Sequence, residues 1–169
     1  TLSKMLAGKQ VSVYPTLRAT THGIAGQSTP KDLETALQLM YLYVADPRFD
    51  AEEYETGIQQ IKAVLPNLLN TPDFKFQKFV NDKLYAGNER AVVIDEEVME
   101  KASLETIERV YRQLYKNAAG ATLTIVGNVD LETLKPMVEK YIGSIAKGKK
   151  PAKVNKENLV QMAKGVSEN

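Results

Sequence analysis

The chain has 169 residues, a length that suits one ordinary domain with a two-layer core. Its composition, 43% hydrophobic and 25% charged, is that of a soluble globular protein, and a net charge of +1 argues against a strong field for nucleic acid or an anionic membrane. No apolar run approaches the ~20 residues of a membrane-spanning helix, and the lack of cysteine excludes disulfides and thiolate chemistry within these residues.

The N-terminal elements are predicted to be the end of a helix and a β-hairpin. The opening TLSKMLAGK has apolar residues at helical spacing and a glycine stop, which indicates an excerpt whose helix begins earlier. Alternation in Gln10–Tyr14 predicts a half-buried strand that Pro15 interrupts. The threonine-rich segment Arg18–Ala25 is expected to pair with it.

The next segment carries the best-defined helix. Thr29 is a suitable N-cap, Pro30 suits the first helical position, and Asp32 falls where the helix dipole favours an anion. Asp46-Pro47 is expected to end the helix. Its apolar stripe comprises Leu33, Ala36, Leu37, Met40, Tyr41 and Val44.

Two further helices are predicted before the middle of the chain. One runs from an N-cap at Asp50 to about Leu65, where Pro66 breaks the pattern. The other covers about Asp73–Ala86 and stops at Gly87. The side chains expected to point inward on the second of these are Phe76, Phe79, Val80 and Leu84.

The C-terminal half is predicted to hold two helices and one strand. Asn88–Asp95 leaves two alternatives for its AVVI, a short strand or a buried loop, and Glu96–Lys101 suits one helical turn. Ser103 caps a helix, and Ala121–Val126, between two glycines, reads as a strand. The inward side chains of that helix are Leu104, Ile107, Val110, Tyr111 and Leu114.

The last helix follows the turn at Asn128–Asp130. Because Pro136 lies past its first turn, regular helix is expected only from about Lys135. Leu134, Val138 and Tyr141 are expected to face inward. From Ala146 onward the sequence becomes rich in lysine and weakly apolar, which is typical of a linker.

Strands and helices are segregated along the chain, which favours an α+β fold with an antiparallel-rich sheet and helices packed on one face. Residues 1–146 are expected to form a single domain and residues 147–169 a linker to a following domain. Three strands make a small sheet, so further strands are expected in an N-terminal part outside this sequence.

The single histidine, His22, limits the metal chemistry. A catalytic zinc site typically takes three protein ligands, and the H-E-x-x-H motif needs two histidines on one helical face. His22 is therefore interpreted as an ordinary strand residue.

Short motifs with glycine or serine also favour structural interpretations. Gly26–Pro30 lacks the second glycine of a nucleophile elbow, and helix capping explains Ser28 and Thr29 better. Leu6–Lys9 and Val126–Asp130 lack the glycine spacing of phosphate loops, and the second suits a tight turn with an aspartate N-cap.

Charged clusters and tyrosines favour surface and packing roles. The acidic groups at Glu52-Glu53 and Asp95–Glu97 are interpreted as solvated surface. Lysines 147, 149, 150, 153 and 156 suit a solvated linker better than a nucleic-acid site, since no aromatic residues are interleaved. The tyrosines are expected to pack in the core or an interface.

Two segments resemble the insulinase/pitrilysin family of zinc metallopeptidases. They are STPKDLETALQLMYLYVADPRFDAEEYE and YKNAAGATLTIVGNVDLETLKPMVEKYIGSI. Val126–Gly143 matches the family's domain ending, VGN-D-x-x-x-L-x-P-x-V-x-x-Y-I/L-G, almost position for position. In this order and spacing the resemblance extends over about residues 1–146.

The resemblance implies homologous α+β domains, commonly four, of which usually one carries the inverted zinc motif H-x-x-E-H and a downstream glutamate ligand. That motif is missing here. Glu52–Leu65 offers Glu52, Glu53 and Glu55 but lacks the family's E-R-x-x-V-x-x-E pattern. No catalytic, cofactor-binding or metal-binding residue is therefore carried over to this chain. The LAGK opening is similar to that of the third domain.

The resemblance then implies a non-catalytic domain of a zinc endopeptidase that forms part of the substrate chamber. Zinc would belong to the parent enzyme and not to this segment, which is expected to be inactive alone. Its partners would be the catalytic half of the parent chain and a peptide substrate, in the bacterial periplasm or cell envelope. The alternatives are a structural or assembly subunit of the same fold and a peptide-binding module that uses an edge strand such as Gln10–Tyr14.

Overall fold

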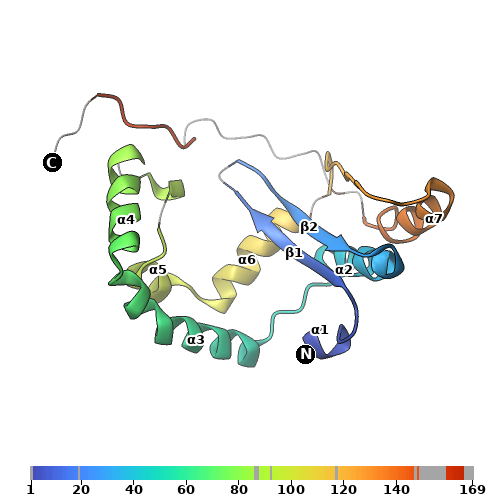
Figure 1. The fold of residues 1–169 in the computed structure, drawn as a ribbon, viewed down its shortest axis with the longest axis horizontal. Helices are drawn as coiled ribbons and strands as arrows, with labels where there is room; N and C mark the ends of the chain where they lie inside the picture. Colours follow the sequence, from blue (N-terminus) through green and yellow to red (C-terminus); the bar gives the residue numbers. More distant parts are fainter. Residues whose placement is uncertain are drawn as a thin grey trace. The chain divides into compact units, whose positions relative to one another are not determined.

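A computed structural model describes residues 2–18, 20–85, 88–91, 93–116, 118–146, 148 and 159–165. Within these residues, seven α-helices and one antiparallel hairpin of two strands confirm the α+β class (Figure 1). The chain divides into two compact units. Unit 1 comprises Thr1–Arg48 and Val110–Lys153, and unit 2 comprises Phe49–Arg109 and Val154–Asn169.

The hairpin of unit 1 follows a short helix. Helix α1 (Leu2–Met5) is followed by Gly8, whose φ of +84° is the left-handed conformation that glycine adopts readily. Strands β1 (Val11–Leu17) and β2 (His22–Ser28) then pair antiparallel, from Val11 opposite Ser28 to Leu17 opposite His22. The predicted hairpin is confirmed, with strand boundaries a few residues further along the chain than expected.

Pro15 does not interrupt the first strand, which corrects the prediction. It lies inside β1 and pairs with Ile24. A two-stranded sheet leaves one edge of each strand without a ladder, and a proline is tolerated where its missing N–H would point to such an edge.

Helix α2 holds the hairpin in place. A 3₁₀ turn, η1 (Pro30–Asp32), leads into α2 (Leu33–Ala45), which ends before Pro47 as expected. Among the described residues, Leu37 is the most deeply buried large side chain, with 1% exposed. Val13, Ala36 and Leu39 form the core between hairpin and helix, and partly buried Leu6, Val11, Ile24, Met40 and Tyr43 pack around them.

Helix α7 (Leu131–Tyr141) packs on α2, which lies between the hairpin and α7 (Figure 1). It begins at Leu131, so the expected start near Lys135 was wrong. The Asp130 carboxylate accepts hydrogen bonds from the Thr133 N–H (2.9 Å) and hydroxyl (3.0 Å). This cap stabilises the first turn, and the helix continues through Pro136.

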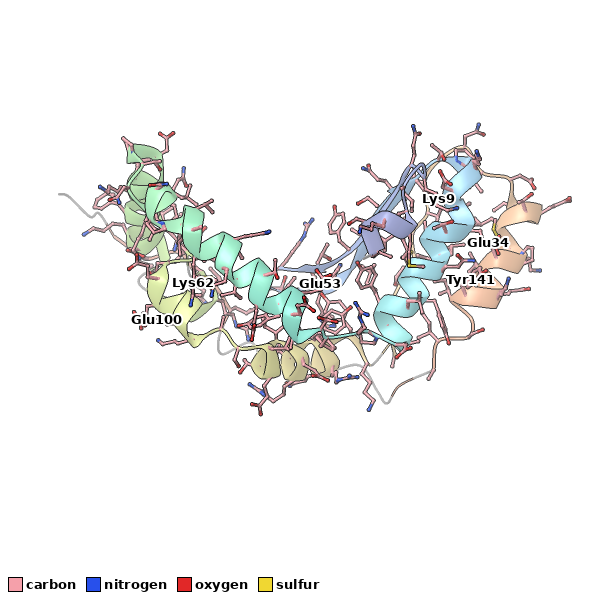
Figure 2. The ribbon with its side chains drawn as sticks, turned by 90° about the horizontal axis from the view of Figure 1, so that it is seen from below. Lys9, Glu34, Glu53, Lys62, Glu100 and Tyr141 are labelled. Carbon is pink, nitrogen blue, oxygen red and sulfur yellow. The ribbon has the colours of Figure 1, made fainter. Side chains whose placement is uncertain are left out.

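Side chains also join α2 and α7. The Tyr141 hydroxyl donates to Glu34 Oε1 at 2.6 Å and accepts from Gln38 Nε2 at 2.9 Å (Figure 2). Lys140 Nζ lies 3.4 Å from the same Glu34 oxygen. The hydrogen bond from Tyr141, and after it the one from Lys140, lowers the pKa of Glu34. Leu134 is buried in α7, as predicted.

Ala121–Val126 forms no strand, so the prediction of a third strand there was wrong. The sheet of the described residues contains only β1 and β2, and Val126 is 92% exposed. Strand propensity alone does not form a strand, because the backbone needs a neighbour to complete its ladder.

Unit 2 contains α3 (Ala51–Leu69), α4 (Pro72–Tyr85), the 3₁₀ turn η2 (Glu89–Ala91) and α5 (Glu96–Lys101). Helix α6 (Leu104–Tyr115) begins in this unit and ends in unit 1. The expected N-caps at Asp50 and Ser103 are confirmed, and Asp95 caps α5 in the same way. Asp50 accepts from Glu53 N–H (3.1 Å), Asp95 from Val98 N–H (3.1 Å) and Ser103 from Thr106 N–H (3.2 Å).

Three expectations for unit 2 were wrong. Helix α3 does not end at Pro66 but continues to Leu69, so the proline lies in its last turn. Helix α4 has no buried residue, and the expected core residues Phe76, Phe79 and Leu84 are 63%, 41% and 37% exposed. The AVVI segment is neither a strand nor a buried loop in its described part, since Ile94 is 57% exposed.

The C-terminal tail is described only at residue 148 and residues 159–165. In the second of these stretches, the Ala163 N–H donates to the Leu84 carbonyl at 2.6 Å. The linker prediction for residues 147–169 and the predicted stop at Gly87 lie mostly or wholly outside the described residues. No helix in the described part has the length and apolar character to cross a membrane.

Candidate functional site

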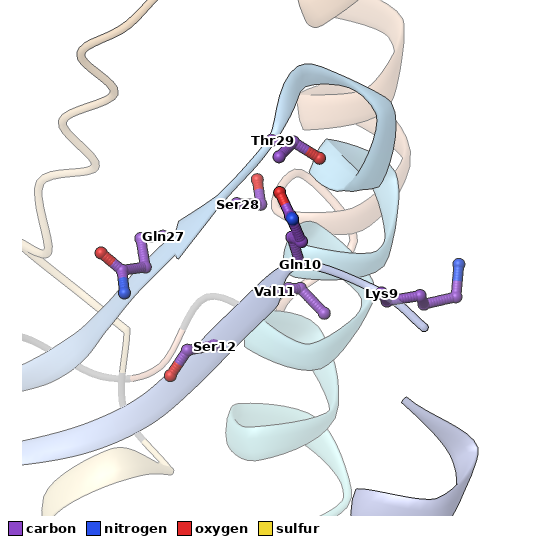
Figure 3. Close-up of a pocket in the computed structure, with 7 residues that line it drawn as sticks. All are labelled: Lys9, Gln10, Val11, Ser12, Gln27, Ser28 and Thr29. Atoms are coloured by element: carbon purple, nitrogen blue, oxygen red, sulfur yellow. The ribbon is translucent and has the colours of Figure 1, made fainter. Parts of the chain in front are cut away.

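A shallow hollow lies at the open end of the hairpin, opposite its turn (Figure 3). Its volume is about 420 Å³. The first residues of β1 and the last residues of β2, with their flanks, line it: Lys9, Gln10, Val11, Ser12, Gln27, Ser28 and Thr29. Most of these side chains are neutral hydrogen-bonding groups, so the hollow suits polar, uncharged groups such as amides.

Asp32 fixes the two ends of the hairpin beside this hollow. Its Oδ2 accepts the Gln10 N–H at 2.9 Å and the Thr29 hydroxyl at 3.1 Å. The Thr29 N–H in turn donates to the Gln10 carbonyl at 3.1 Å. Asp32 is only 7% exposed, and the Gln10 hydrogen bond is the main cause that lowers its pKa, against the opposing effect of burial. We call this arrangement the Asp32 clamp.

Lys9 brings the only full charge to the lining of the hollow. Its Nζ lies 3.8 Å from Asp32 Oδ1 and donates to Thr35 Oγ1 at 3.1 Å. The positive charge is therefore largely balanced by Asp32, which makes the hollow a poor site for a free anion.

A pair of stacked tyrosines occupies a second part of unit 1. Tyr111 and Tyr115 on α6 have ring centroids 4.4 Å apart. Tyr111 donates to the Tyr43 carbonyl at 2.8 Å and Tyr115 to the Thr16 carbonyl at 2.7 Å. Burial raises the pKa of Tyr111 to about 12 and also raises that of Tyr115. Both hydroxyls are neutral at physiological pH and tie α6 to α2 and the hairpin.

His22 is exposed at the start of β2, and its ring meets the edge of Tyr115 at 5.5 Å between centroids. Among the described residues, no group of three histidine, cysteine, aspartate or glutamate side chains is placed to hold a metal ion. With one histidine and no cysteine in all 169 residues, the donor set does not fit a catalytic zinc.

The serine and threonine before α2 act differently from the prediction. Thr29 stands at the N-cap position, but its hydroxyl does not bind the helix backbone and donates to Asp32 instead. Ser28 ends β2 at the rim of the hollow. The turn after Val126 does lead to the predicted aspartate cap of α7.

The glutamates of the two acidic groups are exposed, as interpreted, whereas Asp95 is half-buried and caps α5. Glu52 and Glu53 are exposed in the first turn of α3, and Glu97 forms an ion pair with Lys101 at 2.6 Å. The five lysines of the tail at 147, 149, 150, 153 and 156 lie outside the described residues.

The sequence interpretation missed the Asp32 clamp. The signal was the spacing of Thr29 and Asp32, which matches a capping box with aspartate in place of glutamate. In the usual box the acid reaches back to the N-cap N–H. Here it reaches Gln10 in the preceding strand, a partner 22 residues away that no local pattern identifies.

Comparison with known proteins connects the chain with peptidases. Residues 101–167 match the family model of the Peptidase M16 inactive domain, a range that includes Val126–Gly143 but not Ser28–Asp50. No curated protein sequence matches the chain significantly.

The fold is similar to part of a solved structure, a mutant of the ferredoxin protease FusC in complex with Arabidopsis ferredoxin. The TM-score is 0.67 at 15% sequence identity, over 96% of this chain. The chain spans only 17% of the length of that FusC chain. The C-terminal part of the chain therefore matches the inactive domain of M16 (pitrilysin/insulinase) peptidases, and nearly the whole chain shares the fold of one part of FusC.

Proposed function

We propose that this chain is a non-catalytic domain of an M16-type zinc endopeptidase, the third of four, and that it forms part of the wall of the substrate chamber. The observation that carries the proposal is the match of residues 101–167 to a domain described as inactive. The fold likeness to 17% of the FusC chain supports it. The single histidine supports it as well, because H-x-x-E-H needs two.

In this role the chain would position substrate and support the catalytic half of the same polypeptide. The mainly uncharged lining of the hairpin hollow suits hydrogen bonds to peptide amides. Zinc and the general base that activates its water would belong to the catalytic half. FusC is named a ferredoxin protease, so a small folded protein such as ferredoxin is a substrate class to test beside peptides.

Calorimetric zinc titration and a peptidase assay test the inactive role. The purified 169-residue chain should bind no stoichiometric zinc at sub-micromolar affinity and should cleave neither a mixed peptide library nor ferredoxin. A tight zinc site, or cleavage that a chelator abolishes, would contradict the proposal.

The complete reading frame decides between the peptidase and its main alternative. An H-x-x-E-H motif elsewhere in the frame supports the peptidase parent, and activity of the full-length protein should then depend on that motif. If the frame lacks the motif throughout, the chain is better explained as a structural or assembly subunit of the same fold. We also propose a bacterial periplasmic or envelope location, which fractionation of cells that express the full-length protein tests.

A strand edge that pairs with no strand in the described part of the chain favours a second candidate, a peptide-binding module. The outer edge of β1 offers backbone N–H and carbonyl groups at Val11 and Val13, although Pro15 has no N–H to add to them. An unlabelled peptide panel added to the isotope-labelled chain tests this role. Shifts of the Val11 and Val13 amide signals would support it, and unchanged signals across the panel would count against it.

A further inference from the structure

Polar contacts hold helix α4 in an orientation that leaves an apolar face exposed. The Lys78 ammonium lies 3.8 Å from Asp95 Oδ2, and the Asn81 side-chain amide donates to the Ala91 carbonyl. Both side chains belong to the half-buried face of the helix, whose members share one helical spacing: Phe74, Lys78, Asn81 and Tyr85. These contacts fix the rotation of α4 within unit 2.

The opposite face of α4 is apolar and open. Its apolar members, again at helical spacing, are Phe76, Phe79, Val80 and Leu84. In the described part of the tail, the hydrogen bond to α4 lies at the C-terminal end of the helix, from the Ala163 N–H to the Leu84 carbonyl. Phe76 and Phe79 stay exposed beside it. Such an exposed apolar face commonly marks an interface.

Two opposite charges stand at the ends of this face. Asp73 lies in the first turn, three residues before Phe76, and Lys83 lies in the last turn, seven residues after it. Both therefore project from the same side of the helix as Phe76, about 15 Å apart along the axis. In the part of the chain that the structure describes, neither forms a salt bridge, and the Lys83 ammonium lies 5.6 Å from the centre of the Phe79 ring.

An apolar face with a negative start and a positive end is complementary to itself in reverse. When two copies of α4 pack antiparallel and cross at the level of Lys78, Asp73 of each copy lies opposite Lys83 of the other. Phe76 then lies opposite Val80 of the other copy. A parallel arrangement would instead place like charges together. The helix dipole favours both charges at these ends, but it does not require them to lie on the apolar face.

We propose that this face of α4 pairs with the same face of a second copy of this chain, with the two helices antiparallel. This pairing goes beyond the proposed function and depends on neither zinc nor cleavage. Because α4 has 14 residues, it is only about 21 Å long. The contact is therefore small, and the dimer is weak and depends on concentration.

The charges of the face weigh against other occupants. Asp73 would be repelled by an anionic membrane or an acidic peptide, and Lys83 by a basic peptide. The face as a whole has no net charge, so neither an anionic nor a cationic partner gains from it. A partner with the opposite order of charges gains at both ends, and a reversed copy of α4 has that order.

Sedimentation velocity on the 169-residue chain, from about 5 μM to about 500 μM, tests the pairing. A reversible equilibrium between monomer and dimer is expected, and Phe76→Ser should weaken it strongly. Because Phe76 is exposed, the circular dichroism of this variant should match that of the natural chain. A monomer at every concentration, or a dimer that Phe76→Ser leaves unchanged, would overturn the proposal.

Charge reversal tests the register. Asp73→Lys leaves two cations on the face and Lys83→Asp leaves two anions, so each variant alone should have a dimer dissociation constant at least about tenfold higher. An equal mixture of the two should associate again, because opposite charges then meet at both ends. Lys135→Asp on α7 is the matched control, since it reverses an exposed charge away from α4, and it should change nothing. A mixture that stays monomeric, or a control as weak as the variants, would contradict the register.

Introduced cysteines report the orientation cleanly, because the chain has none of its own. In the antiparallel pair, the two copies of position 80 lie about 6 Å apart along the axis and the two copies of position 84 about 18 Å apart. Under mild oxidation, Val80→Cys should form a cross-linked dimer and Leu84→Cys should not. Efficient cross-linking of Leu84→Cys would indicate a parallel pair and contradict the proposal.

Two further measurements distinguish the other occupants. Co-sedimentation of the chain with phosphatidylglycerol vesicles, if Phe76→Ser abolished it, would identify a lipid surface as the partner and overturn the pairing. A full-length polypeptide that stays monomeric while the 169-residue chain dimerises would show that another part of the polypeptide covers the face. That result would overturn the pairing as well. Dimers of both proteins, without vesicle binding, are the expected result.

Discussion

At the scale of single residues, one carboxylate joins the segments before β1 and after β2 through three contacts. Asp32 binds the backbone before β1, the hydroxyl after β2 and the ammonium group of Lys9. Removing an acceptor from a buried N–H costs more than the bond itself contributes, because the donor remains desolvated. The Asp32 clamp should therefore stabilise the hairpin more than its few hydrogen bonds indicate.

The first prediction concerns acid stability. The pKa of Asp32 lies below its ordinary value of 3.8, so its contribution is complete above that pH and is lost as pH falls through the lowered folded-state pKa. The free energy of unfolding of the natural chain, measured with urea, should therefore decrease in this acid range. Asp32→Asn keeps an acceptor but no charge, and its pH dependence should be flatter.

Asp32→Ala is the harsher variant because it leaves the Gln10 N–H without its acceptor. Its unfolding midpoint at neutral pH should be lower than that of Asp32→Asn. Glu34 and Asp130 also have lowered pKa values, so some acid sensitivity should persist in both variants. An unchanged pH profile in Asp32→Asn would show that the clamp does not depend on charge.

The second prediction concerns the tyrosine pair. Tyr111→Phe removes a hydrogen bond to the Tyr43 carbonyl and should lower the free energy of unfolding by about 1 kcal/mol. Tyr14→Phe is the control, since Tyr14 is 52% exposed, and should change it by less than about 0.5 kcal/mol. Equal effects of the two variants in urea unfolding would argue against the assigned hydrogen bond.

The raised pKa of Tyr111 also predicts a loss of stability at alkaline pH. The folded-state pKa of Tyr111, about 12, lies above the ordinary 10.0. Its contribution to stability is therefore complete below the ordinary value and is lost as pH rises through the folded one. In an absorbance titration at alkaline pH, one tyrosine should ionise at a higher pH than the others. The Tyr111→Phe variant should lack that step.

At the scale of elements, proline position decides helix stability in α7. Pro136 is the sixth residue of the helix, so it cannot donate to the carbonyl of Glu132. The third prediction is that Pro136→Ala raises the free energy of unfolding by about 1 to 3 kcal/mol, measured by urea unfolding. Pro30→Ala is the control, because Pro30 begins η1 and no helical bond is missing there. A lower stability in Pro136→Ala would contradict this account.

Elements with local signals were predictable, and those that depend on distant partners were not. Caps at Asp50, Asp95 and Asp130 and the stop before Pro47 follow from residues within one turn. Whether Ala121–Val126 becomes a strand depends on a neighbour that its own sequence does not contain. For the same reason the Asp32 clamp was missed, while the N-terminal region of α2 was located correctly.

An apolar stripe that stays exposed explains the wrong burial prediction for α4 in unit 2. An apolar stripe on a helix predicts an inward face, but it does not say which protein surface covers that face. Phe76, Phe79 and Leu84 are well exposed in α4 of this chain. The stripe was identified correctly, and its burial was not.

At the scale of the whole molecule, the exposed apolar side chains give the fourth prediction. The described residues expose several large apolar side chains, among them Val64, Leu68 and Phe76 of unit 2 and Val126 of unit 1. Val64 and Leu68 are four residues apart on α3, so their side chains are neighbours, and grouped exposed apolar side chains commonly mark an interface. The native 169-residue chain should therefore enhance the fluorescence of an apolar dye such as ANS without any denaturant.

Val64→Ser with Phe76→Ser should reduce this fluorescence while circular dichroism stays the same. If the chain belongs to a longer protein, the full-length polypeptide should bind less dye per molecule than the short chain. Strong and equal dye binding by both would indicate that these side chains remain uncovered in the complete protein.

Two glycines of unit 1 oppose a side chain for different reasons, one through backbone handedness and one through lack of space. At Gly8 a Cβ would meet nothing within 4 Å, and only the φ of +84° opposes a side chain. A mirror-image alanine, which prefers positive φ, should therefore fit there better than the natural one. At Gly26 a Cβ would lie 3.0 Å from the Ser12 oxygen and from Val13 Cγ2, where the strands are already in contact. The constraint at Gly8 is one of chirality, which a mirror-image residue relieves, and the constraint at Gly26 is one of volume, because atoms of β1 lie where its side chain would be.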